Sequence, residues 1–391
     1  MESIEFISIF YFSAAWYTTL LIMVWGTVLY YIGSGQQKLL YSQGTPMQGM
    51  AFLYSLAAIF YIGLRPISSE FGDMWLYART FDAYDEMPYR IISFGGEWLW
   101  DDIGIFCANI GLNANEYFLV IEALYVGLML ACCWRLCREN LWFAMLFFFS
   151  AFSFFSYGTN GIRNGLACSV ELLALALFIE KGPKRIVGAI LMFMALGIHR
   201  STMLPSAAAV ATVYVIKDTK MALRFWLISI FLSLTIGPLV VQLFTALGFD
   251  DRMSVYYNSQ ERNAQYFSHT GFRWDFLLYS ALPVAMIWYV TKFRRFTDIG
   301  YTMIANTYLL CNAFWIMVIR ASFSNRFAYL SWFIYPVVVF YPILRMNLWK
   351  DQDRKSAIIL FGYSAFTFFM YFIYYFGTTG FKGFDKYWWL A

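Results

Sequence analysis

The chain has 391 residues, of which 61% are hydrophobic and only 13% are charged, whereas soluble domains carry about 25% charged residues. This composition excludes an ordinary soluble domain, because the core of such a domain cannot absorb so much apolar sequence. The net charge of +4 is too small to indicate nucleic-acid binding. The six cysteines lack zinc-site spacing and are typical of small apolar residues within helices.

Apolar runs of membrane-spanning length follow one another along the chain. They predict an all-α polytopic membrane protein of about twelve helices, forming a single transmembrane domain over residues 1–391. Two runs are shorter than the roughly 20 residues of a full crossing, and we expect them to form a hairpin that turns at His199 below the membrane surface. The predicted spans are 14–32, 48–64, 117–134, 141–157, 164–180, 186–198, 202–216, 225–246, 274–291, 299–319, 327–344 and 356–376.

The distribution of charge orients these spans. When alternate loops are assigned to the two sides, with the N-terminus outside, the inside loops hold 16 Lys and Arg against 6 Asp and Glu. The outside segments hold 12 Lys and Arg against 16 Asp and Glu. Because loops that stay in the cytoplasm are enriched in Lys and Arg, we expect the long polar segments 65–116 and 247–273 to lie on the non-cytoplasmic side.

The outside basic residues have an unusual composition, since ten of the twelve are arginine. Arginine stays charged when partly desolvated and binds phosphate through two parallel hydrogen bonds. Arginines at helix ends around a membrane cavity are therefore suited to a diphosphate carried on a lipid. The alternative is that they reach to the interface or pair with outside carboxylates. The diphosphate-binding candidates are Arg65, Arg163, Arg200, Arg273, Arg320 and Arg326.

Other polar side chains form small groups near these arginines. Asp73 and Tyr77 are four residues apart and share a face if that stretch is helical. Arg163 and Asn164 lie at a helix start, where free N–H groups favour an anion. His199 is the first candidate for a general base, although a structural hydrogen bond is an equal alternative. Asp73 and Glu97 are the second candidates for the base, and no metal is expected because no Asp-x-Asp stands in the outside segments.

These motifs resemble the EpsG-like family of bacterial polysaccharide membrane proteins. The stretch Gly63-Leu64-Arg65-Pro66, with Gly72-Asp73 and Tyr77, is similar to the early loop of that family. His199-Arg200-Ser201 resembles its His-x-Ser turn, and Asn164 stands where the family often has glutamine. The remaining similar stretches are Gly161–Ala167, Gly271–Phe276 and Phe323–Tyr329, the last of which adds Asn325 beside Arg326 as a substrate-binding candidate.

The resemblance implies a polymerase of the Wzy type, which makes O-antigen or exopolysaccharide. Such an enzyme transfers a growing glycan from undecaprenyl diphosphate to an undecaprenyl-diphosphate-linked oligosaccharide repeat unit. The implied fold is a GT-C-like membrane glycosyltransferase in the bacterial cytoplasmic membrane, with its active face on the periplasmic or extracellular side. The implied partners are the lipid-linked oligosaccharide, the lipid bilayer and, as a candidate, a chain-length regulator. No cofactor and no nucleic acid are expected.

Three other classes of protein fit part of the pattern. A flippase or transporter for lipid-linked oligosaccharide fits the number of helices, although the chain lacks the repeated halves of many transporters. A membrane acyltransferase acting on sugars would need an acyl donor from the cytoplasm, whereas His199 and His269 both face outside in the predicted topology. A structural subunit of an assembly complex is the remaining alternative.

Overall fold

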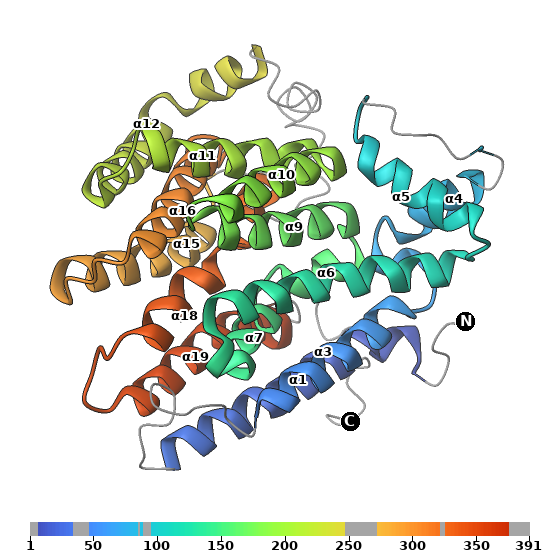
Figure 1. Cartoon of the computed structure of the whole chain (residues 1–391), viewed down its shortest axis with the longest axis horizontal. Coiled ribbons are helices and arrows are strands. Elements are labelled where there is room, and N and C mark those ends of the chain that lie inside the picture. Colours follow the sequence, from blue (N-terminus) through green and yellow to red (C-terminus); the bar gives the residue numbers. More distant parts are fainter. Residues whose placement is uncertain are drawn as a thin grey trace. The chain divides into compact units, whose positions relative to one another are not determined.

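The computed structural model describes residues 7–33, 47–84, 87–88, 95–246, 272–320 and 325–374. Helices make up all the regular structure within these ranges (Figure 1), and the all-α prediction is confirmed. The helices are α1 (Ile9–Gly33), α3 (Gln48–Gly63), α4 (Met74–Tyr84), α5 (Trp98–Asn109), α6 (Ala114–Cys137), α7 (Leu141–Phe149), α8 (Phe154–Thr159), α9 (Ile162–Phe178), α10 (Pro183–Ile198), α11 (Met203–Tyr214), α12 (Thr219–Ala246), α15 (Trp274–Trp288), α16 (Ile299–Met317), α17 (Asn325–Trp332), α18 (Tyr335–Arg345) and α19 (Gln352–Phe369).

Six helical stretches of the described residues are long and apolar enough to cross a membrane. The chain is therefore a helical membrane protein, but this finding does not extend to twelve full crossings. Several of the predicted spans are too short as helices, since α9, α10 and α11 contain 17, 16 and 12 residues against roughly 20 for a full crossing. The six stretches are Ile9–Gly33, Ala114–Phe149, Thr219–Gly237, Trp274–Phe293, Phe327–Arg345 and Gln352–Ile373.

Two of the predicted spans are broken inside their apolar runs. The run 141–157 is divided between α7, which ends at Phe149, and α8, which begins at Phe154. The run 327–344 is divided between α17 and α18, and Pro336 lies just after the break. Proline has no backbone N–H to donate to the carbonyl of Trp332, so the helix is interrupted there. Because both interruptions lie within apolar sequence, the hydrophobic pattern alone predicted continuous helices.

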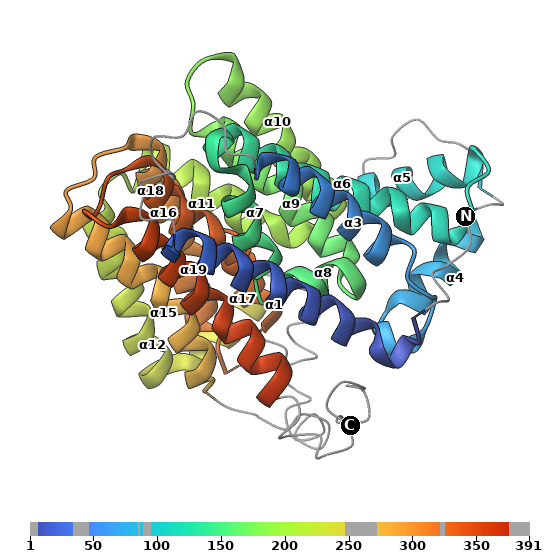
Figure 2. The ribbon, with the colours of Figure 1, turned by 90° about the horizontal axis from the view of Figure 1, so that it is seen from below.

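The chain forms two compact units. The first, unit 1, comprises Met1–Phe178, Gly182–Arg200 and Ile343–Ala391, and the second, unit 2, comprises Ile179–Lys181 and Ser201–Pro342. Within unit 1, α3 packs against α6, α6 against α9, and α9 along α10. Figure 2 shows α1 beside α19 in the same unit. Helix packing within unit 1 therefore brings the start of α9 close to the end of α10.

Unit 2 is organised around α16, which contacts α11, α12, α15 and α17. Several of its buried polar groups are hydrogen-bonded between helices: the indole N–H of Trp226 donates to Asn312 Oδ1 at 2.8 Å, and Asn312 Nδ2 donates to Ser331 Oγ at 2.9 Å. The indole of Trp332 donates to Ser280 Oγ at 2.7 Å. Such pairing is expected in apolar surroundings, where an unpaired polar group is costly.

The first long polar segment, 65–116, forms two short helices of its own, α4 and α5, which pack on each other. Of the second predicted outside segment, 247–273, residues 247–271 lie outside the described residues. That the whole chain is one transmembrane domain stays a prediction. That segments 65–116 and 247–273 lie on the non-cytoplasmic side also stays a prediction.

Candidate active site

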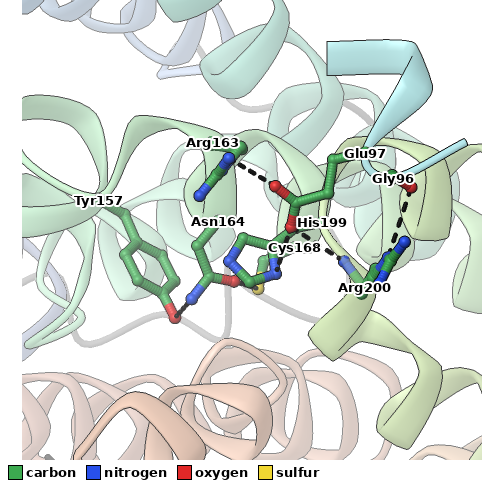
Figure 3. Close-up of polar contacts among 8 residues, drawn as sticks. All are labelled: Gly96, Glu97, Tyr157, Arg163, Asn164, Cys168, His199 and Arg200. Carbon is green, nitrogen blue, oxygen red and sulfur yellow. Dashed lines mark hydrogen bonds and ion pairs between the residues drawn. The ribbon is translucent and has the colours of Figure 1, made fainter. Parts of the chain in front are cut away.

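Four of the predicted site residues meet in unit 1: Glu97, Arg163, His199 and Arg200 (Figure 3). We call them the Glu97 cluster. Glu97 Oε2 lies 2.5 Å from Nη1 of Arg163, and Glu97 Oε1 lies 3.5 Å from Nδ1 of His199. The backbone N–H of Arg200 donates to the same Oε1 at 3.3 Å. The carboxylate of Glu97 therefore joins the other three residues.

The α9–α10 hairpin brings His199 to Arg163. Arg163 lies in the first turn of α9, and His199 directly follows α10. The two helices have 17 and 16 residues and pack along each other. Because their lengths are nearly equal, the end of α10 returns to the start of α9. This local geometry follows from two apolar runs separated by the charged turn around Lys181.

Glu97 reaches the hairpin from a separate segment of the chain. It precedes α5, whose N-terminal end packs on α10. The ring of Trp98 contacts the ring of Phe193, with centroids 6.0 Å apart. The contact of Trp98 holds the neighbouring Glu97 carboxylate over the end of α10. A residue of the polar segment 65–116 thereby joins residues more than sixty positions later in the chain.

The Glu97 cluster is half-buried and carries excess positive charge. The side chains of Glu97, Arg163 and His199 are 19%, 25% and 26% exposed, while Arg200 is exposed and its Nε donates to the carbonyl of Gly96 at 3.5 Å. Two guanidinium groups and one carboxylate leave one net positive charge when the imidazole is neutral. A partly desolvated site of this sign favours an anionic ligand.

Asn164, next to Arg163 in the chain, contacts two residues that the sequence did not point to. Its Nδ2 donates to the hydroxyl of Tyr157 at 3.1 Å, and its Oδ1 accepts from the thiol of Cys168 at 3.6 Å (Figure 3). Cys168 could have been found from its spacing, because it lies four residues after Asn164 on the same helix face. Tyr157 could not, because it lies on α8, beyond a helix break that the apolar run conceals.

A tyrosine on α4 lies close to the cluster. The hydroxyl of Tyr84 donates to Asp101 Oδ1 at 2.7 Å. Burial raises the pKa of Tyr84, the hydrogen bond to Asp101 raises it further, and the nearby charge of Arg163 opposes this. Tyr84 is thus a neutral hydrogen-bond donor that ties α4 to α5.

The remaining candidates of unit 1 have other contacts. Asp73 is exposed, and its backbone N–H donates to Asn160 Oδ1 at 2.9 Å. The ring of Tyr77 packs edge-on against Trp100, with centroids 5.6 Å apart. Arg65 is only 1% exposed, and its guanidinium donates to backbone carbonyls. The described contacts of Asp73, Tyr77 and Arg65 thus hold the segment that begins at Arg65 against its neighbours.

The other candidates lie in unit 2. Arg273 forms a two-pronged pair with Asp275, at 2.9 and 2.6 Å, and its guanidinium carbon lies 3.7 Å from the ring centre of Phe276. Arg320 is exposed and lies over the ring of Phe272, 5.8 Å from its centre. Asn325 and Arg326 begin α17, and their side chains lie outside the described part of the chain. Substrate binding by these residues stays a prediction.

The geometry of the Glu97 cluster has a recognisable chemistry. A carboxylate beside Nδ1 fixes the orientation of an imidazole and stabilises the charged form that arises when the ring takes a proton. Guanidinium groups close by can stabilise negative charge on a phosphate. The cluster thus combines the parts for proton removal with those for the departure of an anionic group.

A model of the EpsG family matches residues 50–387. No curated protein and no solved structure matches the chain. The match covers most of the chain and includes every residue of the Glu97 cluster.

Proposed function

Since the chain belongs to the EpsG family, we propose that it is a polysaccharide polymerase acting on lipid-linked repeat units. Its family and its apolar helices make it a membrane protein of polysaccharide biosynthesis. The proposed reaction transfers a growing glycan from undecaprenyl diphosphate to an undecaprenyl-diphosphate-linked oligosaccharide. It takes place at the outer face of the bacterial cytoplasmic membrane, where a chain-length regulator is a candidate partner.

The observation that carries the proposal is the position of Glu97, whose carboxylate contacts both His199 and Arg163. In the proposed step, a hydroxyl of the acceptor sugar attacks the anomeric carbon of the donor glycan. The new carbon–oxygen bond forms as the bond from that carbon to the phosphate oxygen breaks. The electron pair of the broken bond leaves with undecaprenyl diphosphate, and the proton of the hydroxyl passes to the imidazole of His199.

Glu97 supports this step through its charge. The carboxylate holds the ring of His199 through Nδ1 and stabilises the imidazolium once the proton has moved. General-base catalysis of this kind contributes about 10²–10⁴-fold to a rate. Glu97 also fixes the guanidinium of Arg163 relative to the ring. The base and the cation that stabilises the leaving group are thereby held in one arrangement before substrate binds.

Arg163 and Arg200 are assigned to the leaving diphosphate. As the anomeric bond breaks, negative charge grows on the phosphate oxygens, and fixed donors placed at growing charge usually supply the largest catalytic term. The net positive charge of the Glu97 cluster supports this assignment. Arg273 and Arg320 in unit 2, with Asn325 and Arg326, remain candidates for further contacts to the lipid-linked substrates.

We also propose a GT-C-like architecture with about twelve crossings and the N-terminus outside. Helices at each of the predicted runs support this number, with the shorter ones reaching only part of the way across. The arginine-rich outside segments then face the side on which a translocated lipid-linked sugar is found.

The experiment that tests the function uses purified protein in liposomes. The substrate is the lipid-linked repeat unit isolated from cells that lack this chain, so that its sugars need not be known in advance. We expect a ladder of longer glycans with wild-type protein and elongation at least about 10²-fold slower with His199→Ala. If the units remain single while crossing the bilayer, the chain is a flippase and the polymerase proposal is wrong.

A further inference from the structure

The turn between α8 and α9 (Thr159–Gly161) determines where Arg163 lies. Arg163 follows this turn directly, in the first turn of α9. The turn is closed by backbone hydrogen bonds: the N–H groups of Asn160 and Gly161 both donate to Ser156 O at 2.9 Å, and that of Gly165 donates to Gly161 O at 2.8 Å. A shift of these bonds would move the guanidinium of Arg163 relative to Glu97.

A buried arginine fixes this turn from the end of α3. Nη2 of Arg65 donates to the carbonyl of Thr159 at 2.9 Å, and Nη1 donates to the carbonyl of Ile62 at 2.7 Å. The guanidinium carbon lies 5.3 Å from the ring centre of Phe118 on α6. The two ends of one planar group therefore tie the end of α3 to the end of α8. A lysine, with a single compact ammonium group, cannot reproduce this geometry.

A second contact fixes the same turn from the segment after Arg65. Asn160 Oδ1 accepts from the backbone N–H of Asp73 at 2.9 Å. Gly72 next to it has φ of 65°, and a Cβ built there would lie 2.4 Å from Asn160 Cγ. Both the backbone conformation and the close approach thus require glycine at this position. Segment 65–73 holds the turn at Thr159 and at Asn160.

Glu122 on α6 lies at the same end of α8. Its side chain is 1% exposed. The carboxyl group lies against α8, where a Cβ built on Gly158 would be 2.9 Å from Glu122 Oε1. Arg65 and Glu122 therefore both pack at the end of α8.

We propose that Arg65 is a positioning residue for glycan transfer, which fixes the α8–α9 turn together with Asn160 and so sets the guanidinium of Arg163. The proposal rests on the function proposed above, because it takes Arg163 to act on the leaving diphosphate. A catalytic group displaced by about 1 Å can cost as much as 10²-fold in rate, so a residue that never touches substrate can control elongation.

Arg65→Lys tests this proposal, with Arg185→Lys as the matched control. Nε of Arg185 donates to the carbonyl of Phe178 at 3.0 Å and its guanidinium carbon lies 5.5 Å from the Phe178 ring centre. Arg185 thus bonds to the C-terminal end of α9, the helix whose first turn carries Arg163. Hydrogen exchange is measured on peptides that cover the α8–α9 turn. We expect faster exchange there in Arg65→Lys and in Asn160→Ala, which leaves Arg65 in place, and unchanged exchange in Arg185→Lys.

Elongation is then measured for Arg65→Lys with and without Arg163→Lys. If Arg65 acts through Arg163, Arg65→Lys lowers elongation about tenfold in the wild-type background and less than about twofold in the Arg163→Lys background. Unchanged exchange at the turn, or losses that multiply in the double variant, would overturn the positioning role while leaving the polymerase intact. A wild-type protein that makes no polymer overturns the proposed function instead.

Discussion

Arg65 and Arg163 flank the same turn of unit 1 and have opposite surroundings. Arg65 is 1% exposed and donates to two backbone carbonyls, whereas Arg163 is 25% exposed and pairs with the side chain of Glu97. Backbone carbonyls cannot move away without unfolding a helix end, but a carboxylate in a half-exposed cluster can share its partner with a ligand. The hydrogen-bond partners of the two arginines therefore favour a positioning role for Arg65 and a binding role for Arg163, a distinction that their sequence motifs do not make.

Arg65→Met is expected to have the largest effect. The substitution removes the side-chain donor from the buried carbonyls of Ile62 and Thr159, and a buried acceptor left unpaired costs about 1–3 kcal/mol. We expect a fall in folded yield and in thermal unfolding temperature. Arg185→Met, which removes a part-buried donor from the carbonyl of Phe178, is the matched control and should cost less. An Arg65→Met variant as stable as the wild type would show that these two bonds do not stabilise the fold.

The next effect concerns the proposed base. His199→Ala is expected to lower elongation by about 10²-fold or more, because the acceptor hydroxyl loses its proton acceptor. Binding of undecaprenyl diphosphate, measured on the purified protein, should stay close to wild type, since the arginines remain. Normal elongation by this variant would leave His199 a structural residue, and Asp73 or Glu97 would be the next candidates for the base.

Glu97→Gln tests the residue that joins the cluster. The substitution keeps the shape of the side chain but removes the charge that orients His199 and pairs with Arg163. We expect elongation to fall roughly tenfold to a hundredfold, as for other carboxylates that orient a functional histidine. Asp101→Asn is the matched control, because Asp101 lies one turn further along α5 and bonds to Tyr84. Equal losses in both variants would contradict a special role for Glu97.

The smallest effect is expected at the exposed rim. Arg200 is exposed, and its described side-chain hydrogen bond, from Nε to Gly96 O, is long at 3.5 Å. Arg200→Lys keeps the charge, so we expect a loss of a few-fold, mainly in the apparent affinity for the lipid-linked unit. Arg163→Lys should cost more, because its guanidinium is held in a fixed geometry by Glu97. Kinetics at several substrate concentrations separate the two, and the reverse order would contradict this ranking.

The sequence predicted most helix positions because apolar runs and charged turns alternate clearly in parts of the chain. The predicted spans 164–180 and 186–198 differ from α9 and α10 by only a few residues. The division of 141–157 into α7 and α8 was not predictable from hydrophobicity, because the residues at the break, Ser150 to Ser153, include alanine and phenylalanine. The number of full crossings stays a prediction for the same reason, since apolar composition does not fix helix length.

The candidate site was predictable in its members but not in its arrangement. That His199 lies beside Arg163 follows from two neighbouring helices of similar length. The contact of Glu97 depends on the docking of α5 through Trp98 and Phe193, which leaves no periodic signal in the sequence. Arg65 looked like the other helix-end arginines, because its burial is decided by α6 and α8, which pack on it from distant parts of the chain.

Catalysis of glycan transfer by the Glu97 cluster is tested by comparing purified wild-type protein with His199→Gln. Both are given lipid-linked repeat units in liposomes, and released undecaprenyl diphosphate is counted against new glycosidic bonds. Glutamine keeps hydrogen bonding at position 199 but has no useful basicity. We expect one carrier diphosphate released per bond in the wild type, and a rate at least about 10²-fold lower in the variant. Bond formation by His199→Gln at the wild-type rate would contradict general-base catalysis by His199.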